Sequence, residues 1–269
     1  MHHKANLAVG FVTFNPGQEF YDRLRLLGNW GYETYVFDNS PETRATRALC
    51  GSLCGVHYST AGKNVGLGVG LSVINATAYY DGREMLLFFD QDTSFAYQTL
   101  EYINAFSRTH PPEVLERYIA VVFDAQQESH ILPYQVRDVL LAISSGSLFV
   151  LENLKRVGWH NEKYFVDGVD YELCLRARRN GYRVGRCGNT PGFDHESEQP
   201  DRFVKIFNKE LPFRRYSGIR IKDSTKAYLR LIALTLKNLD FRATGAMSRS
   251  FLIFVLGQIL ARTVVTKVA

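Results

Sequence analysis

Short apolar runs alternate with amphipathic stretches along the first half of the chain. Such runs are typical of strands that are buried on both faces of a parallel sheet. We expect strands at residues 7–13, 34–37, 55–58, 86–89 and 118–123. Helical patterns lie between several of them and end near residues 30, 80 and 106. This alternation predicts an α/β fold with a doubly wound, mostly parallel sheet.

The second half of the chain is less regular. A strand is expected at residues 148–150, and a short helix at residues 152–157. Residues 170–180 have the pattern of an amphipathic helix, which Gly181 would end in a left-handed cap. Residues 182–185 are expected to form another strand.

The composition changes near Pro212, which predicts two parts, residues 1–211 and residues 212–269. The second part mixes basic and apolar residues. Its last apolar run, residues 251–261, is shorter than the roughly 20 residues that span a bilayer. A basic amphipathic tail of this kind can lie at a membrane interface. Alternatively, these helices cover the core or a homodimer surface.

Composition narrows the class of protein. The 269 residues are 46% hydrophobic, which allows a sizeable core and makes global disorder unexpected. The net charge of +5 and the pI of 9.0 suit an anionic ligand or a membrane surface. The four cysteines lack zinc-ligand spacing, and the first residues lack the apolar segment of a signal peptide. We expect a cytoplasmic protein with reduced thiols and no nucleic-acid partner.

Acidic residues follow the predicted strands. Asp90 and Asp92 come directly after the run 86–89, at the strand end where open α/β sheets bind ligands. Two carboxylates there can hold a hard divalent cation, and the cation can hold phosphates. Asp38 ends the second strand, where it could bind a nucleobase or a ribose. Aspartates in these positions are also common in turns and helix caps that bind no ligand. A ligand site and a purely structural role therefore both stay open.

Three other segments carry candidate chemistry. The glycine-rich residues 64–70 precede a helix, where backbone N–H groups can face a phosphate or merely form a tight turn. Asp170 opens a predicted helix as a cap or as a general base. His195, beside Asp194, could ligate a metal or meet a diphosphate.

The order of these motifs along residues 7–200 resembles that of family 2 glycosyltransferases with the GT-A fold. Within that family the chain is most similar to bacterial rhamnosyltransferases of O-antigen and cell-wall polysaccharide assembly. The resemblance rests on Thr13-Phe14-Asn15-Pro16, Asp38-Asn39-Ser40, Asn64-Val65-Gly66, Asp90-Gln91-Asp92, Ser145-Gly146-Ser147, residues 170–177 and His195.

The resemblance implies inverting transfer of a sugar from a nucleotide-sugar donor to an acceptor hydroxyl. It implies that Asp90 and Asp92 bind Mg²⁺ or Mn²⁺, with His195 near the metal or the diphosphate. Asp170 would be the general base. The nucleoside and the rest of the donor would be bound by Thr13, Asn15, Asp38, Asn64, Gly66 and Asp90, and the acceptor side would be shaped by Ser145, Gly146, Trp159 and Asp167.

The expected donor is dTDP-L-rhamnose and the expected acceptor a glycan or lipid-linked glycan at the cytosolic face of a membrane. Many relatives carry Glu-Asp where Val169-Asp170 stands here, so Asp167 remains an alternative base. A UDP-hexose is an alternative donor. A nicotinamide-dependent Rossmann oxidoreductase is a second class of protein. The absence of the glycine-rich fingerprint after the first strand argues against it. A non-catalytic glycan-binding protein is a third.

Overall fold

The computed structural model describes residues 7–125, 132–194, 202–206, 209–213 and 215–263. Its contacts divide the chain into two compact units, which are described separately. The first comprises residues 1–165 and 169–195, and the second comprises residues 166–168 and 196–269.

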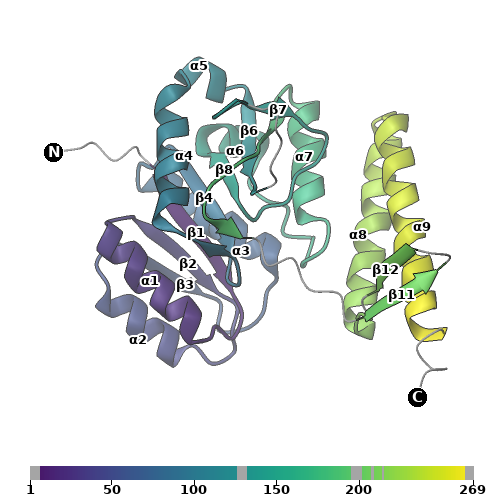
Figure 1. Cartoon of the computed structure of the whole chain (residues 1–269), viewed down its shortest axis with the longest axis horizontal. Helices are drawn as coiled ribbons and strands as arrows, with labels where there is room; N and C mark the ends of the chain where they lie inside the picture. The colour runs from purple at the N-terminus through teal and green to yellow at the C-terminus, as the bar shows by residue number, and fades with distance from the viewer. Residues whose placement is uncertain (1–6, 126–131, 195–201, 207–208, 214, 264–269) are drawn as a thin grey trace. The chain divides into compact units, whose positions relative to one another are not determined.

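The elements of the first unit alternate between strand and helix (Figure 1). Its strands are β1 (Leu7–Thr13), β2 (Thr34–Asp38), β3 (Val56–Thr60), β4 (Met85–Asp90), β5 (Ser94–Phe95), β6 (Tyr118–Phe123), β7 (Arg137–Asp138), β8 (Ser147–Val150), β9 (Arg183–Cys187) and β10 (Phe193–Asp194). Its helices are α1 (Gln18–Trp30), α2 (Arg44–Ser52), α3 (Leu67–Tyr80), α4 (Tyr97–Thr109), α5 (Pro112–Leu115), α6 (Leu151–Val157) and α7 (Val169–Arg179).

Eight strands form one sheet in the order β3-β2-β1-β4-β8-β6-β9-β7. The pairs β2–β3, β1–β2, β1–β4 and β6–β9 are parallel. Strand β8 runs antiparallel to both β4 and β6, and β7 runs antiparallel to β9. Two short strands, β5 and β10, pair separately. The sheet confirms the predicted α/β fold with a mostly parallel sheet; the reversed direction of β8 was not predicted.

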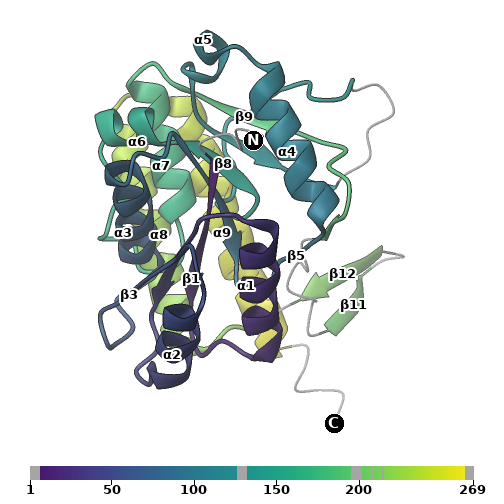
Figure 2. The ribbon, with the colours of Figure 1, turned by 90° about the vertical axis from the view of Figure 1, so that its left-hand side faces the viewer.

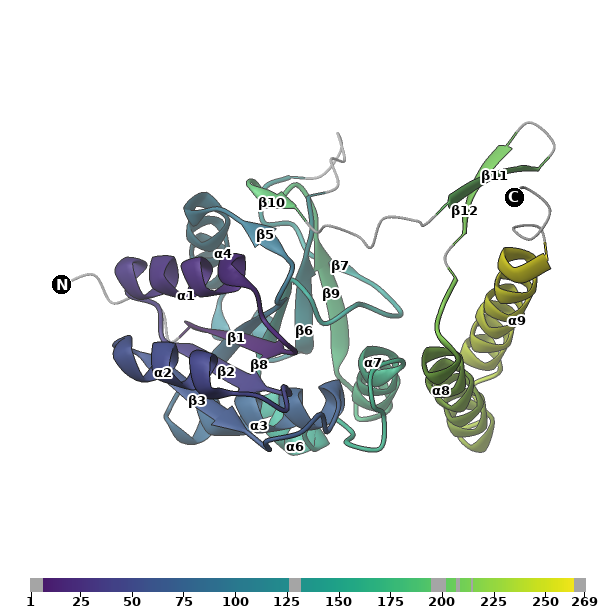
Figure 3. The same cartoon turned by 90° about the horizontal axis from the view of Figure 1, so that it is seen from below.

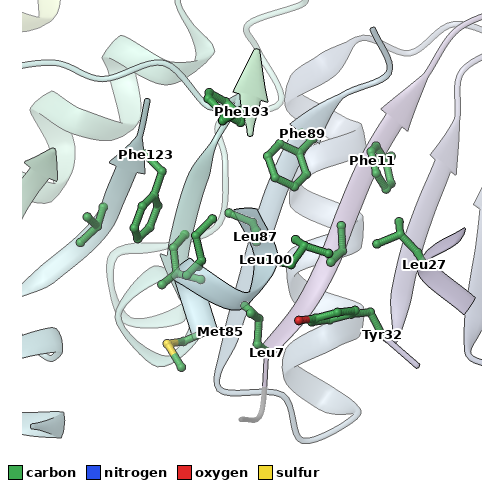
Figure 4. Packing of buried hydrophobic residues seen from close by; sticks show 14 of the residues in the cluster. Leu7, Phe11, Leu27, Tyr32, Met85, Leu87, Phe89, Leu100, Phe123 and Phe193 are labelled. Carbon is green, nitrogen blue, oxygen red and sulfur yellow. The ribbon is translucent and has the colours of Figure 1, made fainter. Parts of the chain in front are cut away.

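Helices cover both faces of this sheet, as Figure 3 shows for α1 and α3. Alternate residues of β1 explain the two layers, because successive side chains of a strand point to opposite faces. Phe11 joins the apolar cluster that includes Phe20 and Leu24 of α1 and Leu100 of α4. Figure 4 shows Phe11, Phe89, Leu87 and Leu100 in this cluster.

The opposite face of β1 accommodates α3 at very short range. A Cβ atom added at Gly10 would lie 3.0 Å from Ile74 Cδ1 of α3, and one added at Gly70 of α3 would lie 2.7 Å from Val12 Cγ1 of β1. Small residues at these two positions therefore let the α3 backbone approach the sheet. Helix α3 begins at Leu67, after the segment that follows the carboxyl end of β3.

The second unit consists of a strand pair and a helix pair (Figure 2). Strand β11 (Arg202–Ile206) pairs antiparallel with β12 (Lys209–Phe213). Helices α8 (Gly218–Lys237) and α9 (Phe241–Thr263) pack together through Tyr228, whose ring lies 5.5 Å from that of Phe251. The same ring lies 5.9 Å from that of Phe254.

Helix α9 corrects one expectation from the sequence. The apolar run 251–261 is only part of a helix that begins at Phe241, where Asp240 accepts a hydrogen bond from the Ala243 N–H group at 2.9 Å. Among the described residues, its 22-residue stretch Phe241–Arg262 is long and apolar enough, by length and composition alone, to cross a bilayer. The apolar run therefore belongs to a longer helix than the sequence pattern indicated.

Candidate active site

The first four strands of the sheet end on a common rim, which we define as the carboxyl ends of β1, β2, β3 and β4. Thr13 pairs in register with Asp38, and Asp38 pairs with Thr60. On the other side of β1, Val12 pairs with Asp90. The parallel register therefore places Thr13, Asp38 and Asp90 on this rim, as the sequence predicted.

Asp38 is fully buried at the rim and is bound by groups of the protein itself. Its Oδ1 accepts a hydrogen bond from the Ser40 N–H group at 2.9 Å, and its Oδ2 accepts one from the Tyr58 hydroxyl at 3.2 Å. The Ser40 hydroxyl in turn accepts a hydrogen bond from the Asn15 N–H group at 2.7 Å. Asn15 has a φ of 48°, a left-handed conformation that is uncommon outside glycine. Asp38 thus fixes the loops that follow β1 and β2.

Asn39 joins the glycine-rich segment to the rim. Its Nδ2 donates to the Gly66 carbonyl at 3.2 Å, and its Oδ1 accepts from the Val65 N–H group at 3.0 Å. Asn39 is buried, so these bonds satisfy an amide that water cannot reach. Sequence reasoning did not single out this residue, although it belongs to the Asp38-Asn39-Ser40 motif.

The N–H groups of the glycine-rich segment bind protein atoms. Gly66 donates to Asn64 Oδ1 at 3.0 Å, and Leu67 donates to the Phe165 carbonyl at 2.5 Å. A Cβ atom at Gly66, whose φ is 95°, would lie 2.6 Å from that same carbonyl. Three successive N–H groups, at residues 65–67, are therefore used within the protein. Gly66 therefore lets the backbone pass close to the Phe165 carbonyl. Any contact of this segment with a nucleotide sugar must come from atoms other than these three N–H groups.

The Asp90-Gln91-Asp92 segment is fastened to the loop after β1. Gln91 Oε1 accepts from the Phe14 N–H group at 2.7 Å, and its Nε2 donates to the Phe14 carbonyl at 3.2 Å. Arg23 donates to the Gln91 carbonyl at 2.6 Å. Asp90 is half-buried, whereas Asp92 is exposed. Gln91 was missed as a site residue because its partner lies 77 positions away.

The two carboxylates fit the chemistry of a hard cation bound together with a phosphate. Among the described residues, no group of three or more His, Cys, Asp or Glu side chains could hold a metal by itself. Mg²⁺ is commonly held by one or two carboxylates, with substrate phosphates and water as its other ligands. Asp90 and Asp92 provide that number of carboxylates.

The predicted base, Asp170, is the second residue of α7 and lies next to the turn before β8. The Ser144 hydroxyl donates a hydrogen bond to Asp170 Oδ1. The neighbouring Ser145 hydroxyl accepts a hydrogen bond from the Asp90 N–H group at 3.0 Å. Hydrogen bonds therefore connect the rim from Asp38, through the loops after β1 and β4, to Asp170. Far-apart segments of the sequence meet here.

Comparison with known proteins supports the α/β fold described above. No family model matches the sequence. The dTDP-rhamnosyl transferase RfbF of Shigella flexneri is 25% identical over 239 residues, which cover 80% of this chain and 78% of RfbF. Similar solved structures include TarS 1–349 of S. aureus in complex with UDP-GlcNAc, with a TM-score of 0.51 and 17% identity over 71% of this chain. Another is GalNAc-T7 with UDP, GalNAc and Mn²⁺, with a TM-score of 0.52 and 12% identity over 70%.

The protein resembles the family 2 glycosyltransferases and has the GT-A fold. The chain spans 59% of the TarS fragment and 44% of GalNAc-T7, so these neighbours establish the fold of the shared part.

Two predicted site residues, Trp159 and Asp167, make contacts elsewhere in the described part of the chain. The Trp159 ring packs against that of Tyr79 at 5.9 Å, in the last turn of α3, whereas Asn64 and Gly66 precede the first turn. Asp167 belongs to the second unit, where its carboxylate accepts hydrogen bonds from Ser224 and, at 3.4 Å, from Arg220. His195 lies outside the described residues. The proposed roles of these three residues stay predictions.

The segment that carries Trp159 is held by a partly buried ion pair. Arg176 Nε lies 2.8 Å from Glu172 Oε1, and Glu172 is only 3% exposed. Arg176 also donates to the carbonyls of Val157, Gly158 and Trp159. Glu172, which lies near the predicted base in sequence, therefore has a structural partner.

His160 follows Trp159 and is buried against the ring of Phe149, at 5.1 Å. Neither of its ring nitrogens has a hydrogen-bond partner among the described residues. Burial, together with the nearby Arg176 charge, lowers its pKa from 6.5 to about 3. The folded protein therefore holds this imidazole neutral.

We predict that His160 makes the protein less stable as the pH falls from about 6.5 to about 3. In this range the unfolded chain binds a proton that the folded chain does not, which costs about 1.4 kcal/mol per pH unit. His160→Leu should reduce the pH dependence by this amount. Urea unfolding of both proteins between pH 7 and pH 4 measures it, and equal slopes would contradict the prediction.

Proposed function

We propose that this protein is a metal-dependent inverting glycosyltransferase that transfers L-rhamnose from dTDP-L-rhamnose to a hydroxyl of a glycan or lipid-linked glycan. The observation that carries the proposal is that hydrogen bonds between neighbouring loops bring together the segments that carry Asp38, Asp90 and Asp170. Nucleoside, metal and base groups must lie together for this chemistry, because effective positioning supplies much of the rate acceleration.

The similarity to RfbF favours dTDP-L-rhamnose as the donor. RfbF is a dTDP-rhamnosyl transferase, and its similarity covers 80% of this chain and 78% of RfbF. TarS binds UDP-GlcNAc, but its lower identity of 17% supports only the fold. A UDP-hexose is the alternative donor, and the product in either case would belong to a surface polysaccharide such as O-antigen or a cell-wall polymer.

The proposed mechanism assigns distinct tasks to the rim residues. Asp92 and Asp90 would hold a Mg²⁺ or Mn²⁺ ion, which offsets charge on the leaving diphosphate. Thr13, Asn15 and Asp38 would lie beside the nucleoside. Asp170 would take the proton of the acceptor hydroxyl from the face of the sugar ring opposite the leaving group. A single displacement in this geometry inverts the anomeric carbon.

Two other classes of protein are less well supported. A nicotinamide-dependent oxidoreductase would need a glycine-rich fingerprint directly after β1, where Phe14, Asn15 and Pro16 stand instead. A non-catalytic glycan-binding protein would not need the acidic residues Asp90, Asp92 and Asp170, which are all present here.

The metal role of Asp92 is tested by replacing it with Ala. Loss of one carboxylate ligand should weaken metal-dependent donor binding by at least about tenfold. Isothermal titration of dTDP-L-rhamnose, with and without Mn²⁺, measures the effect. Asp22→Ala removes an exposed carboxylate of α1 and is the matched control. Unchanged affinity in Asp92→Ala would exclude the metal role.

The base role of Asp170 is tested by replacing it with Asn, which keeps the size of the side chain. Donor binding should persist, while turnover falls by at least about 100-fold because no group takes the acceptor proton. Asp167→Asn is the matched control and should keep most of the turnover, since that carboxylate is bound by Ser224 and Arg220. The reverse result would make Asp167 the base.

We also propose that the second unit binds the cytosolic surface of an anionic membrane, where a lipid-linked acceptor would be found. Residues 215–263 contain nine Arg and Lys but two Asp, a net charge of +7, whereas the whole chain carries +5. The other residues therefore sum to −2. The outward face of α8 exposes Lys222, Lys226, Arg230 and Lys237.

An exposed apolar stripe on α9 also favours membrane binding by the second unit. It consists of residues spaced on one face of the helix, each between 36% and 59% exposed: Leu252, Ile253, Leu256, Ile259 and Leu260. The apolar stripe lies between Arg249 and Arg262 in the sequence. Basic and apolar side chains together favour the interface of an anionic bilayer. A homodimer through this face would bring the like charges of two copies together.

Charge reversal tests the membrane proposal. Lys226→Glu/Arg230→Glu should reduce binding to vesicles containing phosphatidylserine by at least about tenfold, because each basic residue near such a surface contributes about 1 kcal/mol. Arg44→Glu/Arg117→Glu changes the net charge equally on the first unit and should bind as the wild type does. Equal losses of vesicle binding in the two double variants would overturn the proposal. So would a wild-type protein that binds no vesicles and forms a dimer that Leu256→Glu dissociates.

A further inference from the structure

A four-residue turn, Ser144-Ser145-Gly146-Ser147, lies between two acidic segments of the candidate site. These segments are Asp90-Gln91-Asp92 and the start of α7, which carries Asp170. The Ser147 N–H group donates to the Ser144 carbonyl at 2.9 Å and closes the turn. All three serines are buried, between 1% and 5% exposed. Their hydroxyl groups therefore need partners inside the protein.

The sheet holds this turn from both sides. The Gly146 N–H group donates to the Phe88 carbonyl of β4 at 2.8 Å, and the Phe123 N–H group of β6 donates to the Gly146 carbonyl at 2.8 Å. Gly146 has a φ of 75°, and a Cβ atom there would lie 2.6 Å from the Phe123 carbonyl oxygen. Only glycine fits this position without strain. The turn is thus anchored to two strands of the sheet.

The two hydroxyl groups at the start of the turn bind opposite sides of the candidate site. Ser145 Oγ accepts from the Asp90 N–H group at 3.0 Å and lies 2.8 Å from Thr93 Oγ1. Ser144 Oγ donates to Asp170 Oδ1. One side of the turn therefore holds the end of β4, and the other holds the side chain of the proposed base.

We infer that Ser144 and Ser145 are positioning residues that fix the Asp170 carboxylate relative to the Asp90 segment. This inference rests on the proposed function, because it assigns Asp170 to the acceptor side and Asp90 to the donor side. Ser144 holds one carboxylate oxygen of Asp170, which restricts the rotation of that side chain. Ser145 holds the backbone from which the Asp90 and Asp92 side chains extend.

The two serines have separable effects on catalysis. Ser144→Ala leaves the Asp90 segment in place, so donor affinity is unchanged while turnover falls roughly tenfold or more, as expected when a base loses its orientation. Ser145→Ala loosens the Asp90 segment, so the KM for the donor rises. A merely structural role of the turn would move both parameters in both variants.

The matched control is Ser147→Ala. This residue belongs to the same turn, and its hydroxyl donates to the Ile143 carbonyl at 2.6 Å rather than to Asp90 or Asp170. It measures the effect of losing a buried hydroxyl from the turn. Its thermal stability should fall as in Ser144→Ala, whereas its turnover and donor KM should stay close to those of the wild type.

A double-mutant cycle tests the inference directly. Transfer is measured for the wild type, Ser144→Ala, Asp170→Asn and the double variant, each with the donor that the wild type uses. If Ser144 acts through Asp170, its substitution costs less than about twofold in the Asp170→Asn background, because coupled residues are not additive. Equal losses in both backgrounds, or turnover in Ser144→Ala equal to that of Ser147→Ala, would overturn the inference while the proposed function stands. A wild-type protein without transferase activity would overturn both.

Discussion

The parallel pairing of β1 with β2 and β4 is the constraint on which the candidate site depends. Parallel strands end on the same side of a sheet, so three segments far apart in the sequence deliver their last residues to one rim. The register sets Thr13 beside Asp38 and Val12 beside Asp90. Gly10 and Gly70 let α3 pack closely against these strands. A shift of one residue in any of these strands would turn the acidic side chains to the other face.

Amide and hydroxyl side chains hold the loops at this rim in fixed positions relative to one another. Asn39, Gln91 and Ser145 each bind a loop that follows a different strand. Loops of this kind tend to be mobile, but buried polar groups must find partners, and here the partners lie on neighbouring loops. Backbone N–H groups at residues 65–67 are used in the same way. The exposed Asp92 carboxylate extends from a segment that these bonds hold in place.

The parts of the fold that depend on local pattern could be predicted from the sequence. Continuous apolar runs indicated β1, β2, β4 and β6, because both faces of these strands are buried. The direction of β8 could not be predicted, since the pattern of a strand is the same in either direction. The start of α9 was missed because Gly245, Ser248 and Arg249 interrupt its apolar run. The contacts of Gln91 and Ser144 join residues 77 and 26 positions apart and leave no periodic signal.

Electrostatics links the proposed metal to the distribution of charge along the chain. The residues outside 215–263 carry a net charge of −2, and the half-buried Asp90 and the exposed Asp92 lie at the end of β4. A nucleotide diphosphate brought to that rim would meet like charges, whose repulsion is strongest where water is excluded. A divalent cation between the Asp90 and Asp92 carboxylates and the phosphates would turn this repulsion into attraction. The proposed cation would thus let an acidic rim bind an anionic donor, and under the same proposal the basic residues of α8 and α9 would serve a different anionic partner, the membrane surface.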